Sequence, residues 1–326
     1  MLRVAFAGTF SGRLAEPVRR HLTTTCEIVV SDEAGIIAQL IDVDVLVTMA
    51  LTAEMGRAST RLKLVQVPGA GLDRIDRSGL PGGARLANVY GHETGIAEYV
   101  IGAMLALTRD FSRLDAALRA GEWQSQWAVG ATSPSVWPEL AGKTIGILGY
   151  GRIGQAVARR ARAFDMDICA IRHDVRRSSF NRDELAFLGG PESIDEVLGR
   201  SHYVLISMPA TSDTIGSIDR RRLGLLKSTA FLINVARAEV IEEDALYEAL
   251  AQRSIAGAAL DVWYRYPPAT GLTVPATRPF HELPNVLMTP HVSGWTDGML
   301  DARAKLIAEN IRRVACGETP LNLIAS

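Results

Sequence analysis

The sequence predicts an α/β protein built from two Rossmann-like, doubly wound domains. Three observations lead to this prediction. The chain has 326 residues, which is more than one hydrophobic core ordinarily supports. Short apolar segments, typical of buried parallel strands, alternate with segments of helical periodicity. A glycine-rich turn joins one of these segments, residues 145–148, directly to a helix.

The first 90 residues predict the smaller of the two domains. The strand-like segments are residues 2–7, 27–30, 43–48, 62–67 and 85–88. The fourth segment runs into a turn with the sequence Pro68-Gly69-Ala70-Gly71. A glycine-rich turn at the carboxyl end of a strand presents backbone N–H groups that suit a small anion such as a carboxylate. An ordinary connection between a strand and a helix is the alternative.

Residues 93–118 predict one long helix, because apolar side chains recur there at helical spacing. These side chains are Ile96, Val100, Met104, Leu107, Phe111 and Leu114. The stretch that follows carries Trp123, Trp127 and Trp137. The tryptophans either pack against a partner subunit or cover an apolar surface of their own chain.

Residues 144–172 contain a strand, a glycine turn, a helix and a second strand. The spacing G-x-G-x-x-G is formed by Gly149, Gly151 and Gly154. In such a unit the first glycine permits a tight turn, the second lets backbone approach a pyrophosphate, and the third lets helix pack on strand. The helix begins near Arg152 and Ile153, where free N–H groups and a positive dipole end favour phosphates. This turn is therefore predicted to bind a dinucleotide.

The end of the second strand selects between two cofactors. An acidic residue there binds the ribose hydroxyls of NAD, whereas an arginine suits the 2′-phosphate of NADP. The strand, residues 168–171, is followed by Arg172. We therefore predict NADP. Asp174, two residues later, could instead bind the ribose hydroxyls of NAD, so NAD remains an alternative cofactor. A second alternative is that these residues form a solvated basic turn with no role in binding.

Four further strands complete a predicted sheet of six parallel strands. They are residues 203–207, 230–234, 255–262 and 286–288. Ligands of such sheets bind at the carboxyl ends of the strands. Those ends carry Pro209, Arg237, Asp261 and His291. An arginine, an aspartate and a histidine that converge on one edge form a catalytic set, with Pro209 as a cofactor contact. A terminal helix, residues 297–314, is predicted to return to the first domain.

Composition argues against several classes of function. The formal net charge is −1, which gives no electrostatic reason to bind nucleic acid or an anionic membrane. The longest uncharged apolar run, residues 99–107, is too short to span a bilayer. The three cysteines are far apart and lack metal-binding spacing. We therefore expect neither disulfides nor a metal, and a reducing, cytoplasmic location.

Four stretches of the chain occur together in a specific order. They are residues 149–154 (GYGRIG), 233–246 (INVARAEVIEEDAL), 257–263 (GAALDVW) and 285–295 (NVLMTPHVSGW). In these the chain resembles the D-isomer-specific 2-hydroxyacid dehydrogenase family. The resemblance implies a dinucleotide-binding domain, residues 98–296, inserted into a discontinuous substrate domain, residues 1–97 and 297–326. It also implies a homodimer, and hydride transfer between a nicotinamide and C2 of a 2-oxo or 2-hydroxy acid.

The resemblance also implies roles for individual residues. Arg237 matches the arginine that binds the carboxylate and carbonyl of the substrate, and His291 matches the acid/base that protonates the carbonyl oxygen. Asp261 matches the acidic residue that holds the nicotinamide carboxamide. Ala70 and Gly71 match the backbone donors to the substrate carboxylate.

One position departs from the family pattern. The family normally has a glutamate five residues after the aspartate, paired with the histidine, and this chain has Tyr266. A carboxylate raises the pKa of a neighbouring histidine by stabilising imidazolium, and a neutral phenol does so far less. His291 has therefore either lost its usual partner or found another.

Three interpretations follow. The first, which we favour, is a reductase of small 2-oxo acids such as glyoxylate or hydroxypyruvate. The second is a dehydrogenase on the same scaffold with an unusual substrate that fits Tyr264 and Tyr266. The third is a nucleotide-binding sensor that has lost turnover.

Overall fold

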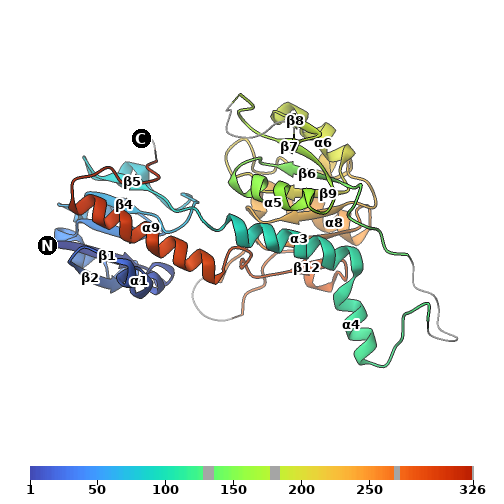
Figure 1. Cartoon of the computed structure of the whole chain (residues 1–326), viewed down its shortest axis with the longest axis horizontal. Coiled ribbons are helices and arrows are strands. Elements are labelled where there is room, and N and C mark those ends of the chain that lie inside the picture. The colour runs from blue at the N-terminus through green and yellow to red at the C-terminus, as the bar shows by residue number, and fades with distance from the viewer. Residues whose placement is uncertain (128–135, 177–183, 268–271, 325–326) are drawn as a thin grey trace. The chain divides into compact units, whose positions relative to one another are not determined.

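The computed structural model describes residues 1–127, 136–176, 184–267 and 272–324, and the chain forms two compact units (Figure 1). Unit 1 comprises Met1–His92 and Trp295–Ser326, and unit 2 comprises Glu93–Gly294. Each unit has its own sheet, and the described strands of both sheets pair in parallel. The prediction of an α/β protein with two Rossmann-like domains is confirmed.

Unit 1 is a five-stranded sheet with the order β2-β1-β3-β4-β5. Its strands are β1 (Leu2–Ala7), β2 (Cys26–Ser31), β3 (Val45–Thr48), β4 (Leu64–Gln66) and β5 (Arg85–Ala87). Its helices are α1 (Thr9–His21), α2 (Ala53–Ala58) and α9 (Asp297–Ala315), with 3₁₀ turns η1 (Ile37–Asp42) and η2 (Arg77–Gly79). All five predicted strands are found, and the order is that of a flavodoxin-like doubly wound sheet.

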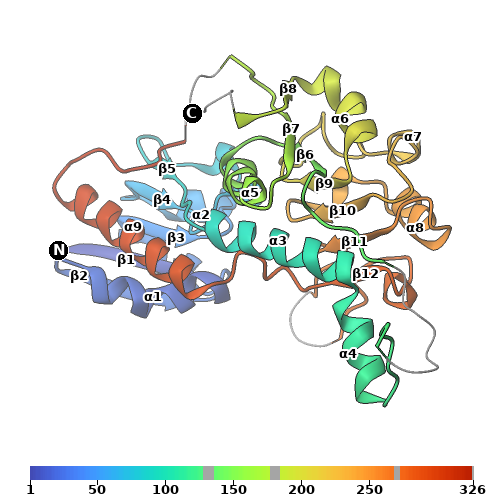
Figure 2. The ribbon, with the colours of Figure 1, turned by 45° about the vertical axis from the view of Figure 1, so that its right-hand side comes forward.

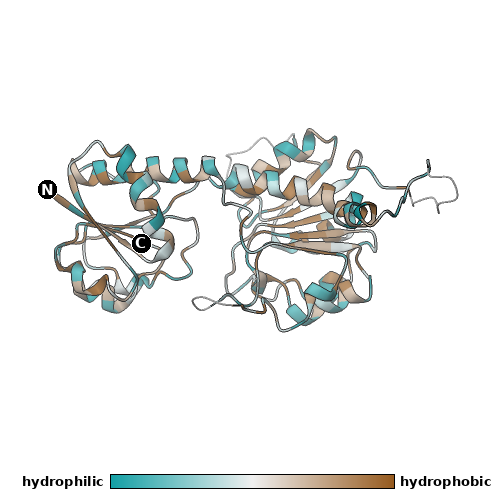
Figure 3. Ribbon diagram, turned by 90° about the horizontal axis from the view of Figure 1, so that it is seen from below, coloured by the Kyte–Doolittle hydropathy of each residue, from teal (hydrophilic) through white to brown (hydrophobic). Residues whose placement is uncertain are grey.

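Alternate residues of the unit 1 strands face opposite layers of the core. Val4 and Phe6 of β1 are buried on the face that α1 and α9 cover. Ala5 and Ala7 are buried on the other face, against residues of η1 and α2. This alternation follows from the two-residue period of a strand. Figure 3 shows the apolar strands between more polar helices.

Unit 2 is a seven-stranded sheet with the order β12-β11-β10-β9-β6-β7-β8. Its strands are β6 (Thr144–Leu148), β7 (Asp167–Ile171), β8 (Phe187–Gly189), β9 (Tyr203–Ile206), β10 (Phe231–Asn234), β11 (Gly257–Leu260) and β12 (Val286–Met288). The prediction of six strands was wrong by one, because β8 is only three residues long and ends in glycine. Its apolar part is only Phe187 and Leu188, which is too little to mark a strand, whereas the equally short β12 consists of three apolar residues.

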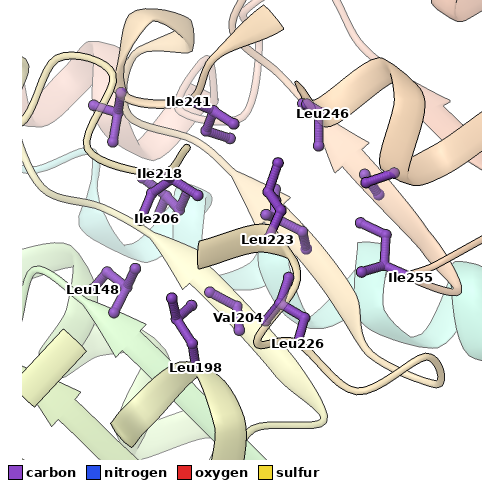
Figure 4. Packing of buried hydrophobic residues seen from close by; sticks show 14 of the residues in the cluster. Leu148, Leu198, Val204, Ile206, Ile218, Leu223, Leu226, Ile241, Leu246 and Ile255 are labelled. Atoms are coloured by element: carbon purple, nitrogen blue, oxygen red, sulfur yellow. The ribbon is translucent and has the colours of Figure 1, made fainter. Parts of the chain in front are cut away.

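Helices cover both faces of the unit 2 sheet (Figure 2). They are α3 (Glu93–Arg109), α5 (Arg152–Arg162), α6 (Ile194–Arg200), α7 (Arg220–Leu223) and α8 (Glu243–Ala251), with 3₁₀ turns η4 (Pro191–Ser193), η5 (Ala238–Val240) and η6 (Phe280–Glu282). A further helix, α4 (Phe111–Arg119), follows α3 and buries no side chain. One face packs against α3 and α5, and the other packs against α6, α7 and α8. Figure 4 shows the second layer, where Leu198 and Leu223 lie beside Val204 of β9, and Leu246 lies on the side of Ile255.

The prediction of one helix over residues 93–118 was also wrong. The chain breaks at Asp110, whose φ of 53° is left-handed, and this residue separates α3 from α4. Aspartate tolerates that conformation better than most residues, and the Arg113 side chain donates to its carboxylate. Apolar spacing continues across the break although Phe111 is 54% exposed. The prediction from apolar periodicity alone therefore extended the helix beyond its end at Arg109.

Two features do not occur in the described ranges. None of the helices there is long and apolar enough to cross a membrane. The same residues contain no group of three or more His, Cys, Asp or Glu side chains that could hold a metal ion.

Candidate functional site at the carboxyl edge of the unit 2 sheet

The glycine turn lies where the order of the unit 2 sheet reverses, between β6 and β9. Gly149 follows β6 with a φ of 107°, and a Cβ on it would lie 2.5 Å from the Met208 nitrogen. A Cβ on Gly154 would lie 2.6 Å from the Gly149 oxygen. Gly151, at the N-cap of α5, faces open space, with no atom within 4 Å of an added Cβ. The first and third glycines thus permit close packing, and the second leaves a backbone surface open.

Arg172 directly follows β7, and its N–H donates to the Gly189 oxygen at 3.0 Å. Its positive charge reaches the phenol of Tyr150 in the glycine turn. Burial raises the pKa of Tyr150, and Arg172 opposes that rise. The carboxylate of Asp174 accepts from the Arg176 N–H at 3.0 Å and so closes its own turn. Arg172 therefore lies by the glycine turn, while Asp174 is engaged locally.

Pro209 follows β9 in an exposed turn. Its carbonyl accepts a 2.6 Å hydrogen bond from the Thr214 hydroxyl, which also accepts from the Thr211 N–H at 2.8 Å. These bonds fix the chain directly after the strand that adjoins β6. Pro209 is therefore on the same edge of the sheet as the glycine turn.

Arg237 lies in the loop after β10, and Asn234 shapes that loop. The Asn234 side chain accepts from the Ala236 N–H and donates to the Arg237 carbonyl, both at 3.0 Å. The guanidinium group donates to the Ala236 carbonyl at 2.7 Å. A buried amide therefore sets the backbone that carries the arginine.

Asp261, after β11, holds the turn after β12. It is fully buried, and its carboxylate accepts from the Thr289 hydroxyl at 2.6 Å and from the Val292 and Ser293 N–H groups at 2.9 Å. Tyr99 of α3 bonds the same Thr289 hydroxyl at 2.7 Å. Because His291 lies inside this turn, Asp261 fixes the backbone on which the histidine is presented.

The side chain of His291 is bonded to Tyr266. The tyrosine hydroxyl lies 2.8 Å from Nδ1 of the imidazole. His291 has a left-handed φ of 57°, so its backbone adopts a conformation that few residues take without support. The sequence left open whether this histidine had lost its partner, and the structure answers that Tyr266 is the partner. Glu282, the only other acid in that part of the sequence, lies beside His281 instead.

The surroundings of His291 favour the neutral imidazole. Burial lowers its pKa from the usual histidine value, the charge of Asp261 opposes this, and Arg237 adds to the lowering. The ring keeps solvent-exposed surface, so the loss of hydration is partial. Burial also raises the pKa of Tyr266, which therefore stays a neutral phenol. The partner of the histidine is thus neutral at ordinary pH.

In unit 1 the glycine-rich turn follows β4. The Asn88 side chain donates to the Ala70 carbonyl at 3.1 Å, and the Val89 N–H donates to the Gly69 carbonyl at 3.1 Å. The turn is therefore held through its carbonyl groups. In the described part of the chain, the amides of Ala70 and Gly71 donate to no other backbone group.

The sequence places Asn234 and Thr289 at strand ends of this edge without indicating a role for them, and it does not single out Tyr99. Asn234 follows an apolar strand and has no chemistry that separates it from an ordinary turn residue. Tyr99 belongs to the apolar stripe of a helix, where an aromatic residue usually signals packing. Thr289 precedes the proline of a recognisable stretch, and this neighbourhood was the one available signal.

A doubly wound sheet with this glycine turn, and with Arg237, Asp261 and His291 at the ends of three neighbouring strands, defines an NAD(P)-dependent oxidoreductase. Residues 101–293 match the family model of the D-isomer specific 2-hydroxyacid dehydrogenase NAD binding domain. The chain belongs to this family. It therefore transfers hydride between a nicotinamide cofactor and a small 2-hydroxy or 2-oxo acid.

Individual relatives cover most of the chain. A glyoxylate reductase of Thermofilum pendens is 32% identical over 95% of this chain and 92% of its own length. A D-3-phosphoglycerate dehydrogenase of Methanocaldococcus jannaschii is 33% identical over 87% of this chain and 52% of its own.

Solved structures show the same architecture. An NADPH-dependent glyoxylate/hydroxypyruvate reductase from Sinorhizobium meliloti, in complex with NADP and malonate, has a TM-score of 0.79 at 26% identity, covering 99% of this chain and 97% of its own. An acyclic imino acid reductase in complex with NADPH and D-Arg has a TM-score of 0.81 at 25% identity and covers 100% of both chains.

Proposed function

We propose that this protein is an NADPH-dependent reductase of small 2-oxo acids such as glyoxylate or hydroxypyruvate. One observation carries the proposal. His291 is hydrogen-bonded through Nδ1 and lies on a turn that Asp261 fixes, while Arg237 lies in the loop after a strand of the same edge. A held acid/base and an arginine on one sheet edge suit an anionic substrate with a carbonyl. In this proposal, residues 98–296 bind the dinucleotide, and residues 1–97 and 297–326 bind the substrate.

The residues present fit a dinucleotide. The open backbone at Gly151 provides room for a pyrophosphate, and Arg152 and Ile153 begin α5, whose N–H groups favour phosphate oxygens. Gly149 and Gly154 supply the close packing that brings this backbone into place. We assign the 2′-phosphate to Arg172, an outer contact to Pro209, and the carboxamide to Asp261. The Oδ2 atom of Asp261 accepts one bond, from the Ser293 N–H, and can accept a second. When bound, the cofactor supplies the hydride.

The chain itself supplies binding and the proton. Arg237 binds the carboxylate and the carbonyl oxygen of the substrate, and the amides of Ala70 and Gly71 bind the carboxylate. His291 gives the proton on Nε2 to the carbonyl oxygen as C2 is reduced, and takes it back in the reverse direction. Both roles need imidazole held at a fixed angle, which the Nδ1 bond provides.

The test uses the variants His291→Ala and Arg237→Ala with glyoxylate and hydroxypyruvate. Loss of the acid/base is expected to lower kcat about 10²–10⁴-fold with little change in KM. Loss of the arginine is expected to raise KM as well, whereas Arg237→Lys retains part of the binding. Both variants should bind NADPH as the wild type does. Near-normal turnover by His291→Ala would refute the mechanism. If the wild type binds NADPH but none of the 2-oxo acids supports oxidation of NADPH, the protein is a sensor and not a reductase.

A second candidate function is the reduction of 2-imino acids, and the neutral Tyr266 favours it. Reduction of a ketone needs a proton from His291, and its surroundings favour the unprotonated form. A protonated imine already carries its proton, so hydride transfer alone completes the step. Rates with 2-oxo acids in the presence and absence of methylamine, from pH 7 to 10, separate the two. Imine reduction predicts amine-dependent rates that persist at high pH.

We also propose a homodimer. Helix α4 has no buried side chains, and Phe111 and Leu118 on it are exposed. Trp123 and Trp127, in the segment that follows α4, are exposed as well. Burial of such a surface against a second copy would remove it from water. Light scattering of the wild type and Phe111→Glu tests this, with a monomeric wild type as the contrary result.

The cytoplasmic location stays a prediction from cysteine spacing.

A further inference from the structure

We propose that Tyr266 is the positioning residue of His291, and that its hydroxyl changes from donor to acceptor as the histidine gains a proton. The inference rests on the proposed function. It goes further by giving the acid/base a neutral partner that serves both of its protonation states.

The first step is that Tyr266 is anchored independently of His291. The three residues before it are each held by a hydrogen bond to another part of the chain. The Tyr264 hydroxyl donates to the Ile241 carbonyl at 3.0 Å, and the Arg265 N–H donates to the Pro275 carbonyl at 2.9 Å. Trp263 is buried, and its indole donates to the Thr289 carbonyl at 2.8 Å. The phenol is therefore presented by a segment held at three successive residues.

The second step concerns the hydrogen bonds available to the phenol oxygen. It lies 2.8 Å from Nδ1 of His291 and accepts a longer bond, 3.4 Å, from the Trp263 N–H. When the imidazole is neutral with its proton on Nε2, the phenol donates to Nδ1. When the imidazole is protonated, Nδ1–H donates to the phenol oxygen, and the phenol proton turns to water. Tyr266 is 50% exposed, so water can reach that proton.

The third step is the proton balance of the reaction. During reduction, imidazolium loses the Nε2 proton to the carbonyl oxygen while C2 receives a hydride, and Nδ1–H remains bonded to the phenol. This leaves neutral imidazole with its proton on Nδ1. Water then returns a proton to Nε2, and loss of the Nδ1 proton to water gives the neutral Nε2–H form to which the phenol donates. A carboxylate in place of the phenol would instead hold Nδ1–H throughout and stabilise imidazolium. The phenol therefore keeps the ring orientation without adding negative charge.

The charged groups that face this pair come from two strand ends. Asp261 and Arg237 both act on His291 and on Tyr266, and Glu239 acts on Tyr266. Asp261 is itself bonded to Thr289, Val292 and Ser293. No group but Tyr266 bonds Nδ1 among the described residues. A change at Tyr266 is thus the direct means of changing the titration of His291.

The experiment compares Tyr266→Glu, Tyr266→Phe and a matched control, Tyr264→Phe. The control removes a hydroxyl two residues away whose bond goes to the Ile241 carbonyl. The titration of the His291 imidazole is followed by nitrogen NMR in the NADP-bound protein, together with the pH profile of kcat/KM. We expect Tyr266→Glu to raise the midpoint by at least about one pH unit. Tyr266→Phe should lower kcat about tenfold, as for loss of one hydrogen bond. Tyr264→Phe should leave the titration midpoint of His291 unchanged.

The NMR arm separates this inference from the proposed function. If the midpoint moves in Tyr266→Glu although no variant reduces a 2-oxo acid, the positioning role stands and the proposed substrate is wrong. If both Tyr266 variants melt like the wild type and neither moves the midpoint or kcat, Tyr266 does not position His291. If Tyr266→Glu fails to fold, Tyr266→Phe decides: a reduced kcat supports the positioning role, and an unchanged kcat contradicts it.

Discussion

The Thr289 hydroxyl donates to the Asp261 carboxylate at 2.6 Å, which ties the end of β12 to the end of β11. Thr289→Val keeps the shape of the side chain and removes this donor. We expect a loss of about 1–3 kcal/mol in the free energy of unfolding, because a buried carboxylate loses a hydrogen bond. The turn that carries His291 should loosen, so kcat should fall. Thr289→Ser is the matched control, and wild-type stability of Thr289→Val would contradict the role.

Gly149 and Gly151 give opposite predictions for the same substitution. Gly149→Ala places a methyl group against the Met208 backbone at a left-handed φ, so we expect a loss of at least about 2 kcal/mol in stability. Gly151→Ala meets nothing, so its stability should change by less than about 1 kcal/mol. Its Kd for NADPH should rise at least about tenfold, because the methyl group occupies the space for phosphate. Denaturant unfolding measures the stability of each variant, and fluorescence titration measures its Kd for NADPH. Wild-type affinity of Gly151→Ala for NADPH would contradict the assignment of Gly151 to the phosphate site.

Arg172 is expected to set the cofactor preference. One charge-assisted hydrogen bond is worth about 1.5–3 kcal/mol, which corresponds to at least about a tenfold preference for NADPH. Arg172→Asp should reverse it, since a carboxylate repels the 2′-phosphate and suits the ribose hydroxyls. Arg176→Asp, which makes the same charge change at an exposed position, should alter the preference less. A wild type with higher kcat/KM for NADH would contradict this account.

His202 is expected to make the fold sensitive to acid. Its Nδ1 accepts from the Thr144 N–H at 3.1 Å, and burial, Lys227 and Lys143 lower its pKa. Above the unfolded pKa, near 6.5, both states are neutral and the group contributes nothing. As pH falls below that value, the unfolded state takes up a proton first, so stability declines until the lower folded pKa is reached. His202→Asn keeps an acceptor and should lose less Tm between pH 7.5 and 5. Parallel losses in the two proteins would exclude His202 as the cause.

The strands could be predicted because their signal is local. An apolar run such as residues 286–288, bounded by polar turns, predicts a strand wherever it lies, and the structure has the half-buried β12 at Val286–Met288. The break at Asp110 could not be predicted in this way, since the apolar spacing is the same on both sides of it. β8 was missed because, within the strand, only Phe187 and Leu188 precede its glycine, and two apolar residues do not stand out as a strand.

The candidate site was predictable as a set of residues and not as a set of bonds. Arg237, Asp261 and His291 follow strands, and parallel strands bring their carboxyl ends to one edge. The partners of Asp261, however, lie 28 to 32 residues away and include two backbone N–H groups. The Tyr266–His291 bond likewise depends on how two loops fold toward each other. Such contacts follow from tertiary structure and leave no periodicity in the sequence.

The return of α9 to unit 1 sets an order of events during synthesis. Ile307 and Ile311 of α9 pack over the same face of the sheet as Leu14 and Val18 of α1. Residues 1–92 are synthesised before residues 295–326, so this face lacks one of its two helices until α9 has been made. Unit 2 is continuous in the chain and has no such delay. A nascent chain therefore carries an unfinished apolar surface while unit 2 is being made, and such surfaces are what chaperones protect.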